Sequence, residues 1–206
     1  ISHTTVMELC EAFFALNPPT RLKLREEALS GTLQALTSGQ ADMAIGVVME
    51  PSNSAGIRSK PLGQMGFVFA VAPHHPLAHA PEPLGDELIQ QHRAVAVADS
   101  VQRGAGMTFG LLGGQDVLTV PGMRAKLQAQ LRGLGGGFLP EPLARPYIET
   151  GRLVVRRVER PSRMPRFSYA WRTSSHAQPG RALQWWLAQL ESPATRAALL
   201  ERQQGF

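Results

Sequence analysis

Few side chains in this sequence have types and spacings that could do chemistry. Two of its six histidines, His75 and His79, stand four residues apart and would share one face of a helix. Pro73, Pro76 and Pro81 exclude a helix there, however, so the segment is expected to be a turn. No cysteine lies near it to complete a ligand set. The sequence therefore predicts no metal site and no cofactor.

Catalytic patterns are missing or misplaced. The chain has no G-x-S-x-G nucleophile elbow. The glycines of 133–137 follow an expected helix and precede an expected strand, the reverse of the order that a phosphate-binding loop needs. Glu26 and Glu27 are adjacent on an expected strand, so they face opposite sides and are expected to end that strand in solvent. We expect no enzymatic activity.

What remains is a set of expected helix N-termini, at 2–5, 30–32 and 121–123. Free backbone N–H groups at such ends favour a carboxylate or another small anion. Four apolar side chains could add a wall suited to an aromatic acid: Met65, Phe67, Phe69 and Met123. The pattern therefore predicts binding of a small carboxylate or aromatic acid.

The helix N-termini depend on the order of helices and strands along the chain. The first expected element is a helix over 6–16, with Thr4 or Thr5 as its N-cap. Two further helices are expected near the other end of the chain, over 179–190 and 193–203.

A strand–helix–strand unit is expected next. Residues 21–25 alternate leucine with charge, which predicts a half-buried strand. A helix over 32–38 follows, capped by Ser30 and closed by Gly39. The apolar run 41–48 is typical of a buried parallel strand. Such a unit implies a parallel sheet with a right-handed crossover.

The same alternation continues along the chain. Strands are expected over 66–73, 93–98, 117–120, 137–139, 153–158 and 167–172. Helices are expected over 84–91, 121–134 and 143–150, with Pro121 at the first helical position of the second, and a loop over 99–114.

This order predicts an α/β fold of two Rossmann-like lobes joined by two crossing strands, the architecture of type II periplasmic binding proteins. Lobe I would comprise 1–70 and 166–206, and lobe II 71–165. A ligand would lie in the cleft between the lobes.

Composition narrows the function further. A length of 206 residues with 43% hydrophobic and 18% charged residues is ordinary for a globular protein, and no apolar run is long enough to span a bilayer. The N-terminus has neither an initiator Met nor a signal peptide, so we expect a fragment cut near a domain boundary. The single cysteine, Cys10, cannot form an internal disulfide and favours a cytoplasmic protein.

The net charge of +5 and the pI near 10.1 raise the question of nucleic acid. The basic residues are scattered, however, and the densest cluster, 152–166, is interrupted by an apolar run and two prolines. Direct DNA contact by this chain is therefore not expected.

Three segments together resemble the effector-binding domain of LysR-type transcription regulators. In residues 25–46, Leu36, Gly39 and Asp42 fit a helix ending in L-x-x-G-x-x-D before an apolar strand. Residues 61–78 resemble the family's crossing strand with its H-P-L ending. Residues 127–154 resemble its G-x-G-x-x-x-x-P segment followed by G-x-L. The three stand in the family's order and cover most of the chain.

The resemblance implies a domain that binds a small-molecule effector and contacts DNA only through a winged helix-turn-helix absent from this chain. Family ligand contacts map onto these positions: Ser2, His3, Thr4, Leu29, Ser30, Gly31, Val47, Asp99, Ser100, Pro121, Gly122 and Met123. Phe69, from the apolar wall, joins this candidate site. The family forms homodimers or homotetramers, and the first helix and the 121–134 helix are the candidate surfaces.

Two alternatives stay open. A periplasmic-type solute-binding protein of a transporter shares the two-lobed architecture, and an upstream signal peptide would support it. A deaminase or dehydratase could also use this fold, but it would need a concentrated set of polar catalytic groups, and the sequence shows none.

Overall fold

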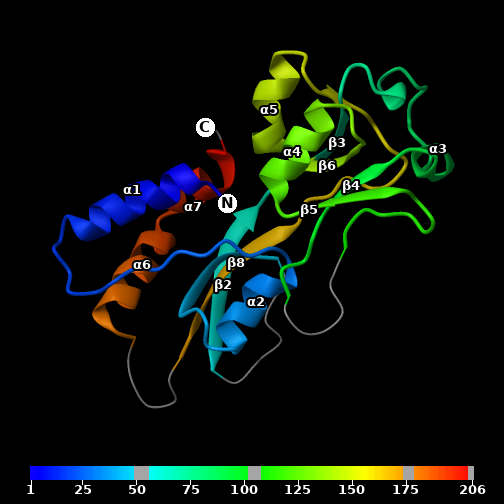
Figure 1. Cartoon of the computed structure of the whole chain (residues 1–206). Coiled ribbons are helices and arrows are strands. Elements are labelled where there is room, and N and C mark those ends of the chain that lie inside the picture. Colours follow the sequence, from blue (N-terminus) through cyan, green and yellow to red (C-terminus); the bar gives the residue numbers. More distant parts are fainter. Residues whose placement is uncertain (49–55, 102–107, 174–178, 204–206) are drawn as a thin grey trace. The chain divides into compact units, whose positions relative to one another are not determined.

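The computed structural model of the chain describes residues 1–48, 56–101, 108–173 and 179–203 (Figure 1). It is mixed α/β, as predicted, and divides into two compact units. Unit 1 contains Ile1–Met65, a short stretch from Ser100, and the chain from Pro165 onward. Unit 2 contains Gly66–Asp99 and the segment that ends at Met164. Each unit is described by itself.

Unit 1 is built on a three-stranded antiparallel sheet of β1 (Met43–Val47), β8 (Arg166–Arg172) and β2 (Ile57–Gln64). Strand β8 lies in the middle, and its five inner residues are all buried while its two end residues are exposed. The central strand of this sheet therefore comes from the late part of the chain, at the place where the sequence predicted a strand.

The strand expected over 21–25 is wrong, because these described residues lie outside any helix or strand. Leu22 packs beside a buried cluster, but Leu24 remains 55% exposed, so the two-residue alternation does not bury enough to hold a strand. The parallel pairing expected for 41–48 is also wrong: β1 pairs antiparallel with β8. No βαβ unit therefore forms in this part of the described chain.

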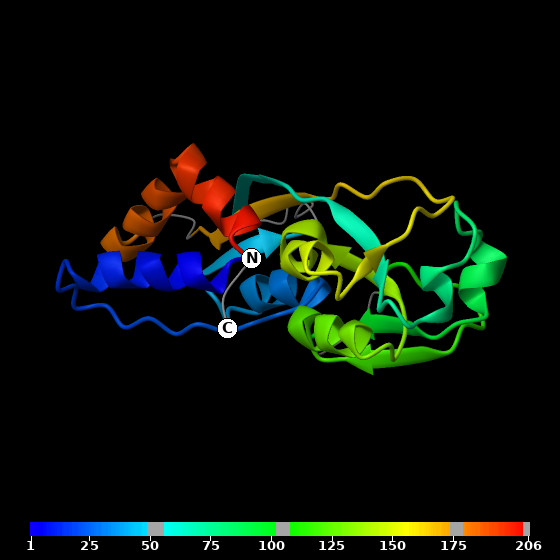
Figure 2. The ribbon, with the colours of Figure 1, turned by 90° about the horizontal axis from the view of Figure 1, so that it is seen from above.

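Helices α1 (His3–Phe14), α6 (Arg181–Glu191) and α7 (Pro193–Glu201) pack together in unit 1 (Figure 2). The backbone N–H of Ser2 donates to the carbonyl of Leu199 at 2.8 Å, which fixes the start of α1 against α7. Leu9 and Phe13 bury against Trp186. The two ends of the chain thus share one core.

Helix α2 (Ser30–Thr37) packs against β1 and β8, where Leu36 buries against Val47 and Ala170 (Figure 1). Gly39 follows the C-cap residue and has φ +76°, a conformation that glycine adopts without strain, so the predicted helix end is confirmed.

The predicted helix starts need correction. The N-cap of α1 is Ser2 rather than Thr4 or Thr5, because the Ser2 hydroxyl accepts the Thr5 N–H at 3.1 Å. Ser30 is the first residue of α2 and not its cap.

The start of α4 (Met123–Leu131) is also corrected, since Gly122 is its N-cap and Pro121 precedes it. The threonine, serine and proline residues on which the predictions rested therefore locate each helix start only to within two or three residues.

Unit 2 contains two sheets. Strands β6 (Gly137–Pro140), β3 (Phe67–Val71) and β7 (Val154–Val155) form an antiparallel sheet, and β4 (Ala94–Val97) pairs parallel with β5 (Val117–Val120). Helices α3 (Asp86–Gln90), α4 and α5 (Glu141–Glu149) and the 3-10 turn Pro76–Ala78 complete the unit.

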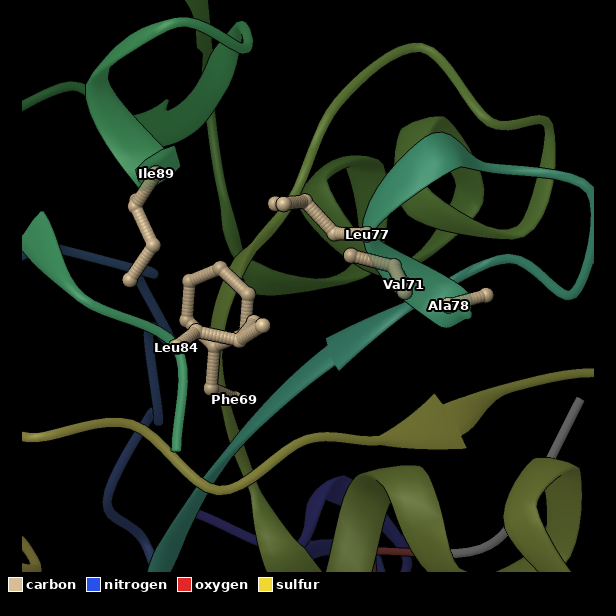
Figure 3. Packing of buried hydrophobic residues seen from close by; sticks show 6 residues of the cluster. All are labelled: Phe69, Val71, Leu77, Ala78, Leu84 and Ile89. Atoms are coloured by element: carbon tan, nitrogen blue, oxygen red, sulfur yellow. The ribbon is translucent and has the colours of Figure 1, made fainter. Parts of the chain in front are cut away.

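Unit 2 has two apolar clusters on different sides of β3. Figure 3 shows the ring of Phe69 beside Leu84, with Ile89 of α3 reaching toward it. Ala70, the next residue, packs instead with Leu127 of α4. Because successive side chains of a strand point to opposite faces, β3 contributes Phe69 to one cluster and Ala70 to the other.

Within the described residues, no helix is both long and apolar enough to cross a bilayer.

Candidate functional site

The predicted ligand positions 29–31 and 100 come together at the start of α2 in unit 1. The backbone N–H of Ala28 donates to the Ser100 hydroxyl at 2.8 Å, and the Ser100 N–H donates to the Ala28 carbonyl at 3.3 Å. The same hydroxyl lies 2.6 Å from a carboxylate oxygen of Glu27. We call Glu27, Ala28, Gly31 and Ser100 the Ser100 cluster.

The Ser100 hydroxyl has one hydrogen for two acceptors, since the Ala28 carbonyl also lies 3.1 Å away. The carboxylate is the stronger acceptor and the closer one. Glu27 is also paired with Arg25 at 2.6 Å, and its side chain is only 15% exposed. The cluster is therefore a half-buried charged network, and the expectation that Glu27 ends a strand in solvent is wrong.

Gly31 allows Ser100 to come this close. A Cβ at Gly31 would lie 2.0 Å from the Ser100 hydroxyl oxygen and 2.9 Å from the Ser100 carbonyl carbon, so any side chain would displace the loop. Leu29, directly before α2, has φ 53°, which is an uncommon conformation for a branched aliphatic residue. Strain of this kind persists where surrounding contacts impose it.

The start of α1 lies beside the same turn. His3 Nε2 is 3.9 Å from a carboxylate oxygen of Glu26, and both side chains are well exposed. Ser2 is 1% exposed and its hydroxyl caps Thr5, so its side chain is occupied within the fold. Thr4 is the next residue of the helix. His3 is thus the most exposed of these three residues.

Val47 lies at the end of β1 and is 2% exposed within the apolar cluster of Leu36. A ligand at this position would meet backbone rather than side chain.

The predicted positions 99 and 121–123 of unit 2 follow two paired parallel strands, β4 and β5, whose ends are joined by the Ala98 N–H donating to the Val120 carbonyl at 2.9 Å. Gly122 caps α4 without a side-chain hydrogen bond, Pro121 is exposed before it, and Met123 packs toward Leu127. Asp99, after β4, is half-buried.

Unit 2 also contains a small hollow next to Phe69. Lys126 of α4 lines it and is only 6% exposed. Burial, with a smaller contribution from the Arg163 guanidinium, lowers the pKa of Lys126 to about 8. The hollow is otherwise lined by apolar residues, by glycines and by Gln115.

Sequence reasoning missed Glu27, Lys126 and Arg163 as candidate functional groups. A signal for Lys126 was available: positions 123, 127 and 130 share one helical face, and 126 adjoins it, so a lysine there is expected to be buried. No local signal joins Glu27 to Ser100, since the two are 73 residues apart.

The expected turn around His75 and His79 is confirmed. His75 Nδ1 accepts the N–H of Leu77 at 3.2 Å, and His79 Nε2 lies 3.1 Å from the carbonyl of Pro73. Among the residues that the structure describes, no three His, Cys, Asp or Glu side chains gather as a metal-ligand set.

Comparison with known proteins identifies the family. Residues 1–194 match the LysR substrate binding domain family, so the chain belongs to it. The HTH-type transcriptional regulator YeeY of Escherichia coli strain K12 is 39% identical over 178 residues, which are 86% of this chain and 57% of YeeY. YhaJ of the same strain, a probable HTH-type transcriptional regulator, is 35% identical over 171 residues, 83% of this chain and 56% of YhaJ.

Solved structures agree on the fold. The regulatory domain of MetR from N. meningitidis has a TM-score of 0.67 at 19% identity, covering 96% of this chain and 89% of that one. Full-length LysG from Corynebacterium glutamicum, solved with bound effector Arg, has a TM-score of 0.63 at 20% identity, covering 90% of this chain and 61% of that one. The predicted type II periplasmic-binding-protein fold is confirmed by these regulatory domains.

The chain spans little more than half the length of the curated relatives it matches. Those relatives are transcriptional regulators, so the transporter alternative is not favoured.

Proposed function

We propose that this chain binds a small-molecule effector and passes its presence to a DNA-binding winged helix-turn-helix carried elsewhere in a LysR-type transcription regulator. Membership of the LysR substrate binding domain family and the HTH-type names of the relatives support this role. Such a regulator would work in the cytoplasm and contact DNA only through its other domain.

The observation that carries the proposal is the Ser100 cluster. Two predicted contact residues that are far apart in sequence, Gly31 and Ser100, meet there in a close contact. Three hydrogen bonds join Ser100 to Glu27 and Ala28, which directly precede the predicted positions 29–31. Polar groups held in this way can bind a ligand without reorganising. We propose that the effector contacts the Ser100 cluster and the exposed His3.

The other predicted positions complete the proposed binding set. In unit 1 these are Ser2, Thr4, Leu29, Ser30 and the backbone at Val47, and in unit 2 they are Phe69, Asp99 and 121–123. Glu27 favours an effector that offers a donor group as well as a carboxylate, because a carboxylate alone would be repelled by it.

Ligand binding would act by shifting the domain between two conformations, which requires a different affinity for each. In a dimer or tetramer this shift would reposition the DNA-binding domains. Helix α1 supports an oligomeric role: Met7 and Phe14, 50% and 49% exposed, share a face that points away from the buried Leu9.

The test is a thermal-shift screen of small carboxylates, aromatic acids and amino acids on this chain, followed by footprinting of the full regulator on its own promoter. We expect a carboxylate-containing compound to raise the melting temperature and to change the footprint. Stabilisation only by sugars or simple cations, or an unchanged footprint at saturating ligand, would reject the proposal.

A further inference from the structure

A buried histidine holds the turn that follows β3 in unit 2. His75 is 6% exposed and is the N-cap of the 3-10 turn Pro76–Ala78. Its ring Nδ1 accepts the backbone N–H of Leu77 at 3.2 Å, and its backbone carbonyl accepts the N–H of Ala78 at 2.9 Å. We call residues 73–79 the His75 turn.

The His75 turn contributes two side chains to the apolar cluster of Phe69. Leu77 is 1% exposed and Ala78 is 5% exposed, and both belong to this cluster (Figure 3). The ring of His75 therefore fixes the backbone of a segment that covers part of the unit 2 core.

The hydrogen bond between His75 and Leu77 exists only while the imidazole is neutral. A neutral imidazole has one N–H and one acceptor nitrogen, so an accepting Nδ1 places the ring hydrogen on Nε2. Protonation adds a hydrogen at Nδ1, where it would face the Leu77 N–H and leave both donors without an acceptor. Because a doubly protonated ring has no acceptor nitrogen, turning the ring over does not restore the bond.

The groups around His75 oppose its protonation. Its ring lies edge to face with the ring of His92, and the two centroids are 5.3 Å apart. His74, which precedes it, has Nε2 3.4 Å from the Arg132 carbonyl at the end of α4. Burial, followed by the charges of His92 and His74, lowers the pKa of His75.

Other ionisable groups near the turn have contacts of their own. His79 Nε2 lies 3.1 Å from a backbone carbonyl of the turn. The Arg156 guanidinium donates to the Ala80 carbonyl and is paired with Glu82 at 3.3 Å. Within the described residues, both charges that act on His75 are those of histidines, and no carboxylate offsets them.

We propose that the His75 turn is a proton-operated latch: uptake of one proton by His75 breaks its bond to Leu77 and releases Leu77 and Ala78 from the Phe69 cluster, while the sheets of unit 2 stay folded. One proton raises the population of the open turn by at most about tenfold per pH unit. The latch responds near the pKa of a free histidine, about 6.5. It belongs to unit 2 and does not depend on the effector site proposed at the Ser100 cluster.

The test is amide hydrogen exchange of this chain, followed by NMR at about pH 7.5 and about pH 5.5 and expressed as protection factors. We expect the protection factors of Leu77 and Ala78 to fall about threefold to tenfold between these pH values. The Ala94 N–H of β4, which donates to the Asp116 carbonyl at 2.8 Å, reports on unfolding of the unit. It should stay at least about tenfold more protected than the turn at both pH values.

Two variants separate His75 from the other titrating groups. His75→Asn keeps an acceptor for the Leu77 N–H throughout this pH range and should remove the fall in protection. His79→Asn removes another histidine of the same turn, whose ring contact with a carbonyl needs only a donor, and should keep the fall. An equal fall in His75→Asn and wild type, or its loss in His79→Asn, would overturn the latch.

Two further results in the wild-type protein would overturn it. Protection of Leu77 and Ala78 equal to that of Ala94 would mean that the turn opens only when the whole unit unfolds. The His75 ring should titrate below pH 6.5, and a ring that titrates at or above this value would show that the fold does not oppose its protonation. This second measurement needs no variant.

Discussion

The hydroxyl oxygen of Ser100 lies 2.6 Å from a carboxylate oxygen of Glu27, although 73 residues separate them in the sequence. The contact joins Ser100 to the turn before α2, and both residues belong to unit 1. A hydrogen bond from a hydroxyl to a carboxylate is stronger than one between neutral groups, so this contact holds Ser100 against the turn before α2.

Ser100→Ala should destabilise unit 1. It removes the acceptor of the Ala28 N–H and the hydroxyl donor of Glu27, so we expect a loss of about 1–2 kcal/mol of unfolding free energy in urea titration. Ser59→Ala, at an exposed position of β2, is the control and should stay within about 0.5 kcal/mol of wild type. Equal stability of the two variants would show that the Ser100 contacts contribute nothing.

Lys126→Met should stabilise the domain at neutral pH. Burial lowers the pKa of Lys126 from 10.5 to about 8, so the charged form opposes folding by about 3 kcal/mol as an upper bound. Loss of side-chain packing is small because methionine fills a similar volume. A higher melting temperature for the variant at about pH 7 is the expected result; a lower one would mean that the ammonium has a stabilising partner.

The same lysine sets a pH dependence. Between about pH 8 and 10.5 the unfolded chain holds the proton that the folded chain has released, so the unfolded state binds more protons and stability should rise with pH. Urea titrations at about pH 8 and pH 10 should show this rise in wild type and a smaller one in Lys126→Met. An equal rise in unfolding free energy in wild type and in Lys126→Met would contradict the lowered pKa of Lys126.

His75 should make the domain sensitive to acid. It is 6% exposed, and burial, followed by the charges of His92 and His74, lowers its pKa below 6.5. As pH falls below 6.5 the unfolded state takes up a proton that the folded state resists, so stability should fall. His75→Asn retains an acceptor for the Leu77 N–H and should lose less stability between about pH 7 and 5.5. If His75→Asn lost as much stability as wild type over this range, the acid sensitivity would arise from another group.

Charge on the outer face of α1 should weaken self-association. Met7 and Phe14 lie seven residues apart, are both about half exposed, and share a face that points away from the buried Leu9. Met7→Glu with Phe14→Glu should raise the dissociation constant of an oligomer at least about tenfold in sedimentation experiments. Ala12→Glu, at an exposed position of α1 outside this face, adds the same charge and is the control. An unchanged sedimentation profile would exclude α1 from the interface.

Much of the fold could be predicted because local patterns set it. The run Val117–Val120 was predicted to the residue, and β8 to within one residue. The failures have a common physical cause: pairing depends on partners distant in sequence. Residues 21–25 have a strand pattern but bury too little, and β1 found an antiparallel partner that no local signal reveals.

The candidate site was predictable in part. Spacing and resemblance indicated 29–31 and 100, which the fold brings together. The partners of Ser100 and the burial of Lys126 arise from packing between elements, and a single sequence carries little information about either. Glu27 was interpreted as a solvated strand end because the strand itself was wrongly predicted.

The central claim is that an effector binds at the Ser100 cluster, and calorimetric titration of a stabilising compound from the screen into Gly31→Ala and Gly180→Ala tests it most directly. A Cβ at Gly31 meets Ser100 at 2.0 Å, whereas a Cβ at Gly180 meets nothing within 4 Å. We predict at least about tenfold weaker binding for Gly31→Ala and wild-type binding for Gly180→Ala. Wild-type affinity in a folded Gly31→Ala protein would contradict the account.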